Sequence, residues 1–340
     1  MRRIVIAAGL MVVLGFVGAC AKQEAVEEVD PVEQAWAEFR EAVGEVETAE
    51  EKMPLIREFI SEYPDTGYAG ILAGAVAYYQ GHAMEDPVGA HALLEETLAK
   101  NNDPETRFQI AVALFPLAVE TGKPADLDAA ASELAATREL SFPELIDVAD
   151  LAVDAEHWET GATYATRALA KSTPEAFLAD YPDDDYTHEE AEAKAVRRKA
   201  MSLANLGWAQ WNLGNADAAQ ATFDEASAYR TFDYLGVPDT PVDLYHARVL
   251  LASGNAEGAI ELVTPAAVLG SDVDAMATLE EAFAVVNDEP AELQSFLWNE
   301  RQRLARSIDD FTLADYEGTS HDFSALSDGK VTLLAFWFPT

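Results

Sequence analysis

Cysteine is almost absent from the sequence, with Cys20 the single thiol in 340 residues. One thiol excludes an internal disulfide and every redox or metal motif built from paired cysteines. Basic residues are also scarce: 22 Lys and Arg stand against 61 Asp and Glu, a formal net charge of −39. That charge excludes nucleic acid as a partner, because a phosphate backbone requires a basic surface. It also opposes electrostatic adhesion to anionic lipid.

Motifs for cofactors and catalysis are missing as well. The six histidines form no HExxH motif, and neither a Gly-rich phosphate loop nor a G-x-S-x-G elbow occurs. The densest candidate for a metal site is the acidic stretch 183–190, which contains His188. This stretch lacks the glycine and the spacing of a calcium loop, so it is interpreted as a solvated loop leading into the acidic first turn of a helix. The sequence therefore predicts neither a metal nor a cofactor.

Hydrophobic residues make up 49% of the chain, enough for a sizeable core. The apolar run from Ile4 to Val17, preceded by Arg2 and Arg3, is too short for a membrane span and has the size of a signal-peptide core. It ends in Val17-Gly18-Ala19-Cys20, which resembles the bacterial lipobox. The resemblance implies a signal peptide over 1–19, lipidation of Cys20 and a tether over 20–31. Ala21 then favours the outer membrane, with the protein facing the periplasm. An ordinary secretory signal is the alternative.

Residues 32–305 are expected to be almost entirely helical, because Ala, Leu and Glu dominate and apolar residues recur three and four apart. Turn clusters interrupt the pattern at 63–67, 101–104, 122–124, 181–183 and 236–238. Alternating strand patterns are absent from this region. The prediction is a mainly α body made of consecutive helices.

The helices show signs of repetition. The unit 199–231 contains Leu206-Gly207, Gly214, Ala219 and Phe223, and it resembles the tetratricopeptide repeat (TPR), although Leu203, Gln210 and Thr231 depart from that pattern. Weaker units surround Gly254 and Ala259, Trp158 and Ala168, and Gly74 and Ala90, and residues 59–66 are typical of the end of another second helix. The aromatic residues Trp208, Trp211, Phe223 and Tyr229 are expected in the core. The resemblance implies a solenoid of helical hairpins that binds a protein or peptide on one face; an irregular all-helical domain is the alternative.

The segment 306–340 differs in pattern. Residues 311–313 predict a short strand, Glu317-Gly318 a turn, 323–326 a helical turn, and 331–338 a buried strand. Together with Gly329-Lys330-Val331 and Phe336-Trp337, this order resembles the start of redoxin domains of the TlpA and thiol-specific-antioxidant types. The resemblance implies an incomplete thioredoxin-like α/β fragment.

In thioredoxin-like redoxins, a nucleophilic cysteine follows the Phe-Trp pair after three residues. Here Trp337, Phe338, Pro339 and Thr340 are only flanking residues, and the nucleophile would come directly after Thr340. We therefore expect the chain as given to be inactive. The hypothesis for that position is a selenocysteine encoded by UGA. The alternatives are a gene fragment, a sequencing error and a nonsense mutation. The DNA sequence after codon 340 discriminates between them.

Two functions remain open from the sequence. The first is a cell-envelope lipoprotein of the thiol–disulfide oxidoreductase type with a helical-repeat body. The second is a non-enzymatic scaffold lipoprotein in which the repeats bind a protein partner.

Overall fold

The computed structural model describes residues 30–122, 126–182, 184–233, 236–270, 272–287, 292–305, 310–315 and 317–328. Helices dominate these residues, in the order α1 (Pro31–Gly44), α2 (Ala49–Glu62), α3 (Gly67–Val76), the π-helix η1 (Ala77–Ala83), α4 (Pro87–Lys100), α5 (Pro104–Thr121), α6 (Leu127–Ala135), α7 (Phe142–Asp154), α8 (Trp158–Ala170), α9 (Pro174–Asp180), α10 (His188–Asn212), α11 (Ala216–Ala226), the 3-10 turn η2 (Ser227–Tyr229), α12 (Val242–Ala252), α13 (Ala256–Leu269), α14 (Val273–Val286) and α15 (Glu292–Leu304). Strands β1 (Thr312–Ala314) and β2 (Ser320–Asp322) and helix α16 (Phe323–Ser327) follow. The prediction of a mainly α body is confirmed.

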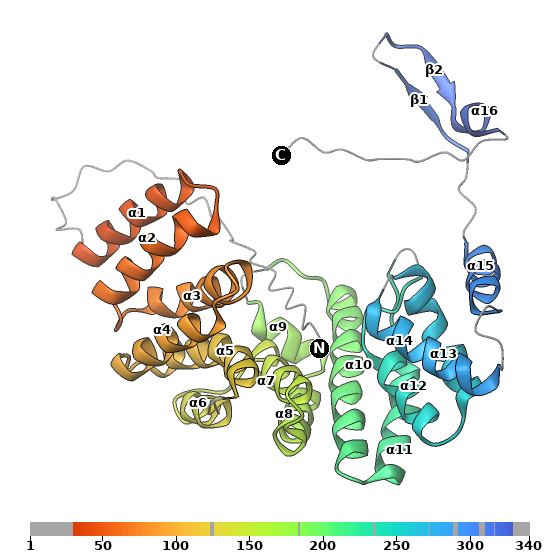
Figure 1. Cartoon of the computed structure of the whole chain (residues 1–340), viewed down its shortest axis with the longest axis horizontal. Coiled ribbons are helices and arrows are strands. Elements are labelled where there is room, and N and C mark those ends of the chain that lie inside the picture. Colours follow the sequence, from red (N-terminus) through yellow and green to blue (C-terminus); the bar gives the residue numbers. More distant parts are fainter. Residues whose placement is uncertain are drawn as a thin grey trace.

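Consecutive helices pair into antiparallel hairpins that follow one another in an arc (Figure 1). The pairs are α1–α2, α3/η1–α4, α5–α6, α7–α8, α10–α11 and α12–α13, and α14 packs on α13. The first helices also form a continuous series, because α3 packs on α5, α5 on α7, α7 on α10, α10 on α12 and α12 on α14. Trp36 of α1 joins the series by stacking on Tyr68 of α3 at a centroid distance of 4.3 Å. We call the side formed by α1, α3, α5, α7, α10, α12 and α14 the first-helix face.

Five second helices share one register. Each begins after an N-cap residue, carries a small buried residue four positions after that cap, and carries a buried apolar residue eight positions after it. The small residue lets the two helices of a hairpin approach closely, and the apolar residue fills the space between them. The series are Asp86/Ala90/Leu94, Asp126/Ala130/Leu134, His157/Gly161/Ala165, Asn215/Ala219/Phe223 and Asn255/Ala259/Val263. This register supports the prediction of repeated helical hairpins.

The turns inside these hairpins are also repeated. Gly214 and Gly254 adopt left-handed φ angles of 82° and 85°. In each turn the glycine N–H donates to the carbonyl three residues back, and the next N–H donates to a carbonyl five residues before itself. Glu156 occupies the same position with φ of 64°; its N–H donates to the carbonyl of Val153, and the N–H of His157 donates to that of Ala152. A left-handed conformation favours glycine, so Glu156 holds the turn at a conformational cost.

The hairpin around Ala90 contains one additional residue. Glu85 takes the turn position with φ of 56°, but the N–H of Asp86 donates to Gln80, six residues back. The additional residue is absorbed in η1, where the chain widens into π-helical turns before α4 begins. The irregularity of this hairpin therefore lies in η1, ahead of α4.

No single core runs through the described helices; instead, several local cores adjoin. One buries residues of α2–α5, a second residues of α5–α8, a third residues of α10–α12, and a fourth residues of α12–α15. Each core is shared mainly between neighbouring hairpins, as expected for a solenoid.

The described C-terminal residues form a small antiparallel hairpin that lies apart from the helical arc (Figure 1). Thr312 pairs with Asp322 and Ala314 with Ser320, and Gly318 makes the turn with φ of 81°. The predicted strand 311–313 is shifted by one residue, β2 was not predicted, and the helical turn at 323–326 is confirmed as α16. A thioredoxin fold is not shown by these residues, because the described part contains a two-stranded sheet only. The predicted strand 331–338 lies outside the described residues.

Candidate binding sites on the first-helix face

The predicted site residues fall partly outside and partly inside the described structure. Cys20 and Trp337, Phe338, Pro339 and Thr340 lie outside the described residues. The acidic stretch after Tyr181 leads into α10, where Thr187 and Glu190 form a capping box. Among the described residues, no group of three or more His, Cys, Asp or Glu side chains could hold a metal ion. The described helices also include none with the length and apolarity to cross a membrane.

Of the four aromatic residues expected in the core, only Phe223 is fully buried. Its ring stacks on His246 at 5.0 Å and lies against Gly207, where a Cβ atom would come within 2.9 Å of the ring. Trp208, Trp211 and Tyr229 are half-buried. Trp208 instead contacts Tyr245 and Arg248 of α12.

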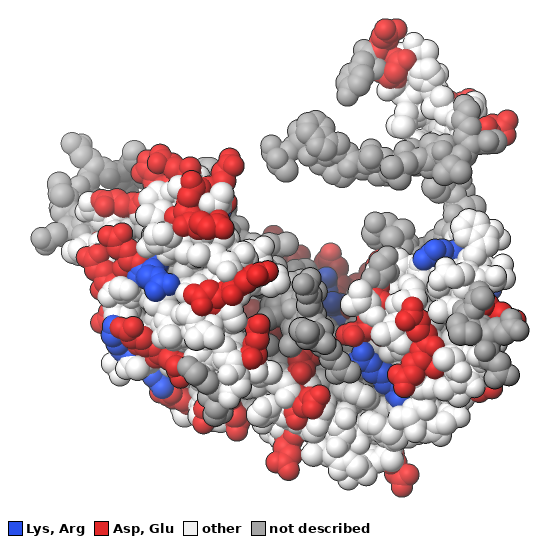
Figure 2. All heavy atoms as spheres, in the orientation of Figure 1, with Lys and Arg blue, Asp and Glu red and all other residues white. Residues whose placement is uncertain are grey.

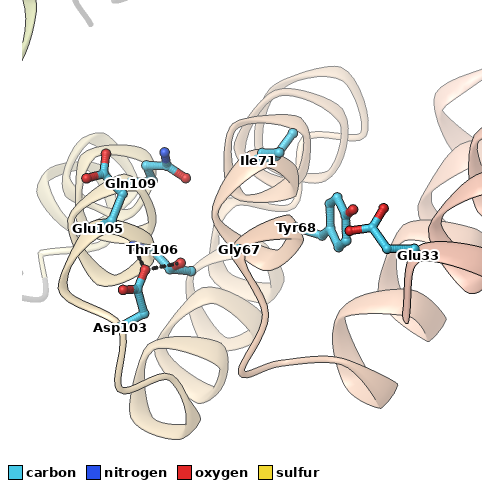
Figure 3. A pocket seen from close by; sticks show the side chains of 8 residues that line it. All are labelled: Glu33, Gly67, Tyr68, Ile71, Asp103, Glu105, Thr106 and Gln109. Atoms are coloured by element: carbon cyan, nitrogen blue, oxygen red, sulfur yellow. Dashed lines mark hydrogen bonds between the residues drawn. The ribbon is translucent and has the colours of Figure 1, made fainter. Parts of the chain in front are cut away.

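The first candidate site is a shallow hollow of about 430 Å³ between α1, α3 and α5 (Figure 3). Its lining combines Tyr68 and Ile71 of α3 with Glu33, Asp103, Glu105, Thr106 and Gln109. Burial and the neighbouring Glu33 carboxylate raise the pKa of Tyr68 to about 12. Asp103, however, is already committed to the start of α5, because it accepts hydrogen bonds from the N–H and Oγ1 of Thr106 at 2.9 and 2.7 Å. The hollow is therefore a surface for contact rather than a set of free ligating groups.

The second candidate site combines carboxylates and aromatic rings from α7, α10, α12 and α14. Asp147, Asp150 and Asp154 are spaced three and four residues apart, which places them on one side of α7. Opposite them lie Asn205 and Trp208 of α10, Tyr245 and Arg248 of α12, and Asp274 of α14. We call these eight residues the acidic–aromatic patch.

The rings and the guanidinium of the patch are in contact. Trp208 stacks on Tyr245 with a centroid distance of 5.4 Å and an interplanar angle of 12°. Trp158, at the start of α8, meets Trp208 edge-on at 6.3 Å. Arg248 lies over the Trp208 ring at 6.0 Å, and its Nη2 is 3.3 Å from Oδ1 of Asp274. The Arg248 guanidinium is thereby already engaged by the Asp274 carboxylate and by the Trp208 ring.

The carboxylates of the patch are electrostatically crowded. Burial, with a smaller contribution from Glu144, raises the pKa of Asp147 to about 6. Burial and the neighbouring Asp147 and Asp154 raise the pKa of Asp150 to about 7, against the opposing hydrogen bond from Asn205. Burial and Asp274 raise the pKa of Asp154, with Arg248 opposing. Asp147 and Asp154 are nevertheless exposed at the surface, so their raised pKa values reflect partial burial, with the like charges beside them adding to it, rather than complete removal from water.

The sequence did not predict this patch. Its α7 carboxylates have the spacing of an ordinary solvated helix face, which is the common reading of such a pattern. Asn205, Tyr245 and Asp274 are separated by tens of residues in sequence and are brought together only by the order of the hairpins. Trp208 was singled out, but as a core residue.

No protein-family model matches the chain, and no curated protein matches it. A solved structure described as a tetratricopeptide repeat protein from Parabacteroides merdae is similar to it, with 10% sequence identity, covering 74% of this chain and 98% of that chain at a TM-score of 0.32. Similarity at that level carries no argument about function. The helical-hairpin architecture is shown by the contacts of this chain itself, and none of these comparisons supports the redoxin resemblance.

Proposed function

We propose that this protein is a non-enzymatic interaction protein that binds an extended segment of a partner protein along the first-helix face. One observation carries the proposal: side chains from four successive first helices converge in the acidic–aromatic patch. Half-buried rings and incompletely paired polar groups on one continuous face are typical of binding surfaces. The first hollow, with Tyr68 and Ile71, extends the same face toward α1.

The test is selection of random twelve-residue peptides against the full-length protein, followed by affinity measurement on variants. Tyr68→Ala and Trp208→Ala remove rings from the first-helix face and should each weaken selected peptides about tenfold or more. Glu159→Gln and Glu261→Gln change exposed residues of the second helices α8 and α13 and should leave affinity unchanged. Failure to select any peptide, or equal losses in both sets of variants, would refute the proposal.

Attachment to the cell envelope is proposed separately. Val17-Gly18-Ala19-Cys20 supports an acylated Cys20 as the mature N-terminus, and several acyl chains would anchor the protein stably. Intact-mass measurement of membrane-extracted protein tests this. An unmodified Cys20, or a start at another residue, would contradict it.

A thiol–disulfide activity is proposed only for a reading frame that continues beyond Thr340. The resemblance of segment 306–340 to the start of redoxin domains is what supports this proposal. The test is the codon after 340 and the frame that follows: UGA with a continuing redoxin frame favours selenocysteine, a Cys codon favours a fragment, and loss of that frame contradicts the activity.

A further inference from the structure

The acidic–aromatic patch carries more negative charge than its own residues neutralise. Asp147, Asp150, Asp154 and Asp274 contribute four carboxylates, whereas Arg248 contributes one guanidinium, already paired with Asp274 at 3.3 Å. Acidic side chains also outnumber basic ones on the face of the molecule seen in Figure 2, in keeping with 61 Asp and Glu against 22 Lys and Arg in the sequence. A ligand with positive charges would complete the patch.

Asn205 provides an independent indication of a ligand. Its side chain is only 1% exposed and is directed at the patch, because its Nδ2 donates a hydrogen bond to Oδ1 of Asp150. Its Oδ1 has no hydrogen-bond partner. A buried acceptor without a donor costs free energy, and an N–H group arriving at Asp150 would lie beside the same amide.

The arrangement of the carboxylates distinguishes between kinds of cation. Asp147 and Asp154 are seven residues apart on one helix, a rise of about 10 Å. Carboxylates at that separation cannot surround one metal ion, and among the described residues no group of three or more His, Cys, Asp or Glu side chains is placed to hold one. An extended peptide covers the same length in about three residues, so the row of carboxylates fits a chain with basic side chains two or three residues apart.

The rings favour a guanidinium within such a chain. Tyr245 lies beside the carboxylates of Asp150 and Asp154, and Trp208 stacks on it with Trp158 edge-on to Trp208. Arg248 already lies over Trp208, at 6.0 Å, within this patch. A second arginine can combine ring contact with two parallel hydrogen bonds to a carboxylate.

We propose that the acidic–aromatic patch binds an arginine-containing basic segment of the partner protein. Asp150 and Asn205 accept hydrogen bonds from the guanidinium of one arginine, and Asp147 and Asp154 bind basic side chains two or three residues away in the same segment. This inference rests on the proposed function and specifies the chemistry of its partner.

The test uses the full-length protein and two labelled peptides, (Arg-Ser-Gly)4 and (Gln-Ser-Gly)4, with affinity measured by fluorescence anisotropy. The arginine peptide should bind and the glutamine peptide should not. Asp150→Asn combined with Asp154→Asn should weaken binding about tenfold or more. Glu257→Gln combined with Glu261→Gln removes the same charge from α13 and should change affinity less than about twofold.

Asn205→Leu separates a built site from general attraction to an acidic protein, since it leaves the net charge unchanged. It should weaken the arginine peptide several-fold. Asp147→Asn changes an exposed side chain and should also weaken binding of the arginine peptide. It supplies the test if the variants at Asp150 and Asn205, which are more buried, fail to fold. Equal losses in the two double variants, or unchanged affinity in both Asn205→Leu and Asp147→Asn, would overturn the inference. Selected neutral peptides that bind the first-helix face and ignore Asp150→Asn would overturn it while leaving the proposed function intact.

Discussion

At the scale of single residues, the turn positions of the hairpins show how local conformation and sequence agree or conflict. Gly214 and Gly254 satisfy a left-handed turn without cost, and Glu156 satisfies the same turn against its preference. The hydrogen bonds of the three turns are equivalent, so the difference between them is confined to one backbone conformation.

Glu156→Gly should therefore stabilise the protein, by about 0.5–1 kcal/mol. Thermal unfolding monitored by circular dichroism measures the effect. Glu261→Gly, in the exposed middle of α13, is the matched control and should destabilise by about 1 kcal/mol because glycine is a poor helix former. A loss of stability in Glu156→Gly would show that the side chain contributes more than the turn costs.

Asp150 makes the patch sensitive to pH. Burial raises its pKa from 3.8 to about 7 on folding; the carboxylates of Asp147 and Asp154 add to the rise and the hydrogen bond from Asn205 opposes it. Tyr245 of α12 is a further titratable group beside it. The folded chain thus holds this proton more tightly than the unfolded chain. The contribution to stability is present below about pH 4 and is lost as the pH rises toward 7.

Asp150→Asn, which cannot ionise, should be more stable than the wild type at about pH 8, by on the order of 2 kcal/mol, and should show no advantage near pH 4. Urea unfolding at a series of pH values tests this. Glu261→Gln serves as the control and should not reproduce the pH-dependent gain. A difference between Asp150→Asn and the wild type that is constant with pH would contradict the assigned cause.

At the scale of elements, the hairpins depend on small residues where two helices meet. Gly207 of α10 faces the fully buried Phe223 of α11, and an added Cβ would come within 2.9 Å of that ring. The ring cannot easily yield, because it stacks on His246. In α3, by contrast, a Cβ added to Gly74 would meet no atom within 4 Å.

Gly207→Ala and Gly74→Ala should consequently have opposite effects. The first should lower the free energy of unfolding by about 1–3 kcal/mol through overpacking, although alanine is the better helix former. The second should raise it by about 0.5–1 kcal/mol. Chemical denaturation measures the free energy of unfolding of both variants. Stabilisation by Gly207→Ala would mean that α10 and α11 can move apart without cost.

At the scale of the whole molecule, the series of local cores predicts stability that varies along the chain. Leu279 is fully buried in the core of α12–α15, while the core of α2–α5 is formed by other residues. Interactions limited to neighbouring hairpins transmit a perturbation only weakly to distant ones.

Leu279→Ala should cost about 2–5 kcal/mol in its own core. Hydrogen exchange followed by mass spectrometry should then show a large loss of protection in α12–α15 and a small one in α2–α5. The reciprocal variant Ile56→Ala should reverse that distribution, since Ile56 is buried in the α2–α5 core. Equal loss of protection throughout the chain in either variant would indicate one cooperative unit instead of a stack.

The sequence by itself determined what local interactions control. Apolar spacing specified the helices, glycines such as Gly214 and Gly254 specified where hairpins turn, and Gly207 with Phe223 indicated close helix packing. The helices and turns depend on residues a few positions apart, and Gly207 and Phe223 belong to the two helices of a single hairpin, so these features can be predicted without knowing the whole fold. The tertiary structure decided the rest. Asp150, Asn205 and Tyr245 become one patch because α7, α10 and α12 follow each other in the stack, and nothing in the spacing of the α7 carboxylates distinguished them from a solvated helix face.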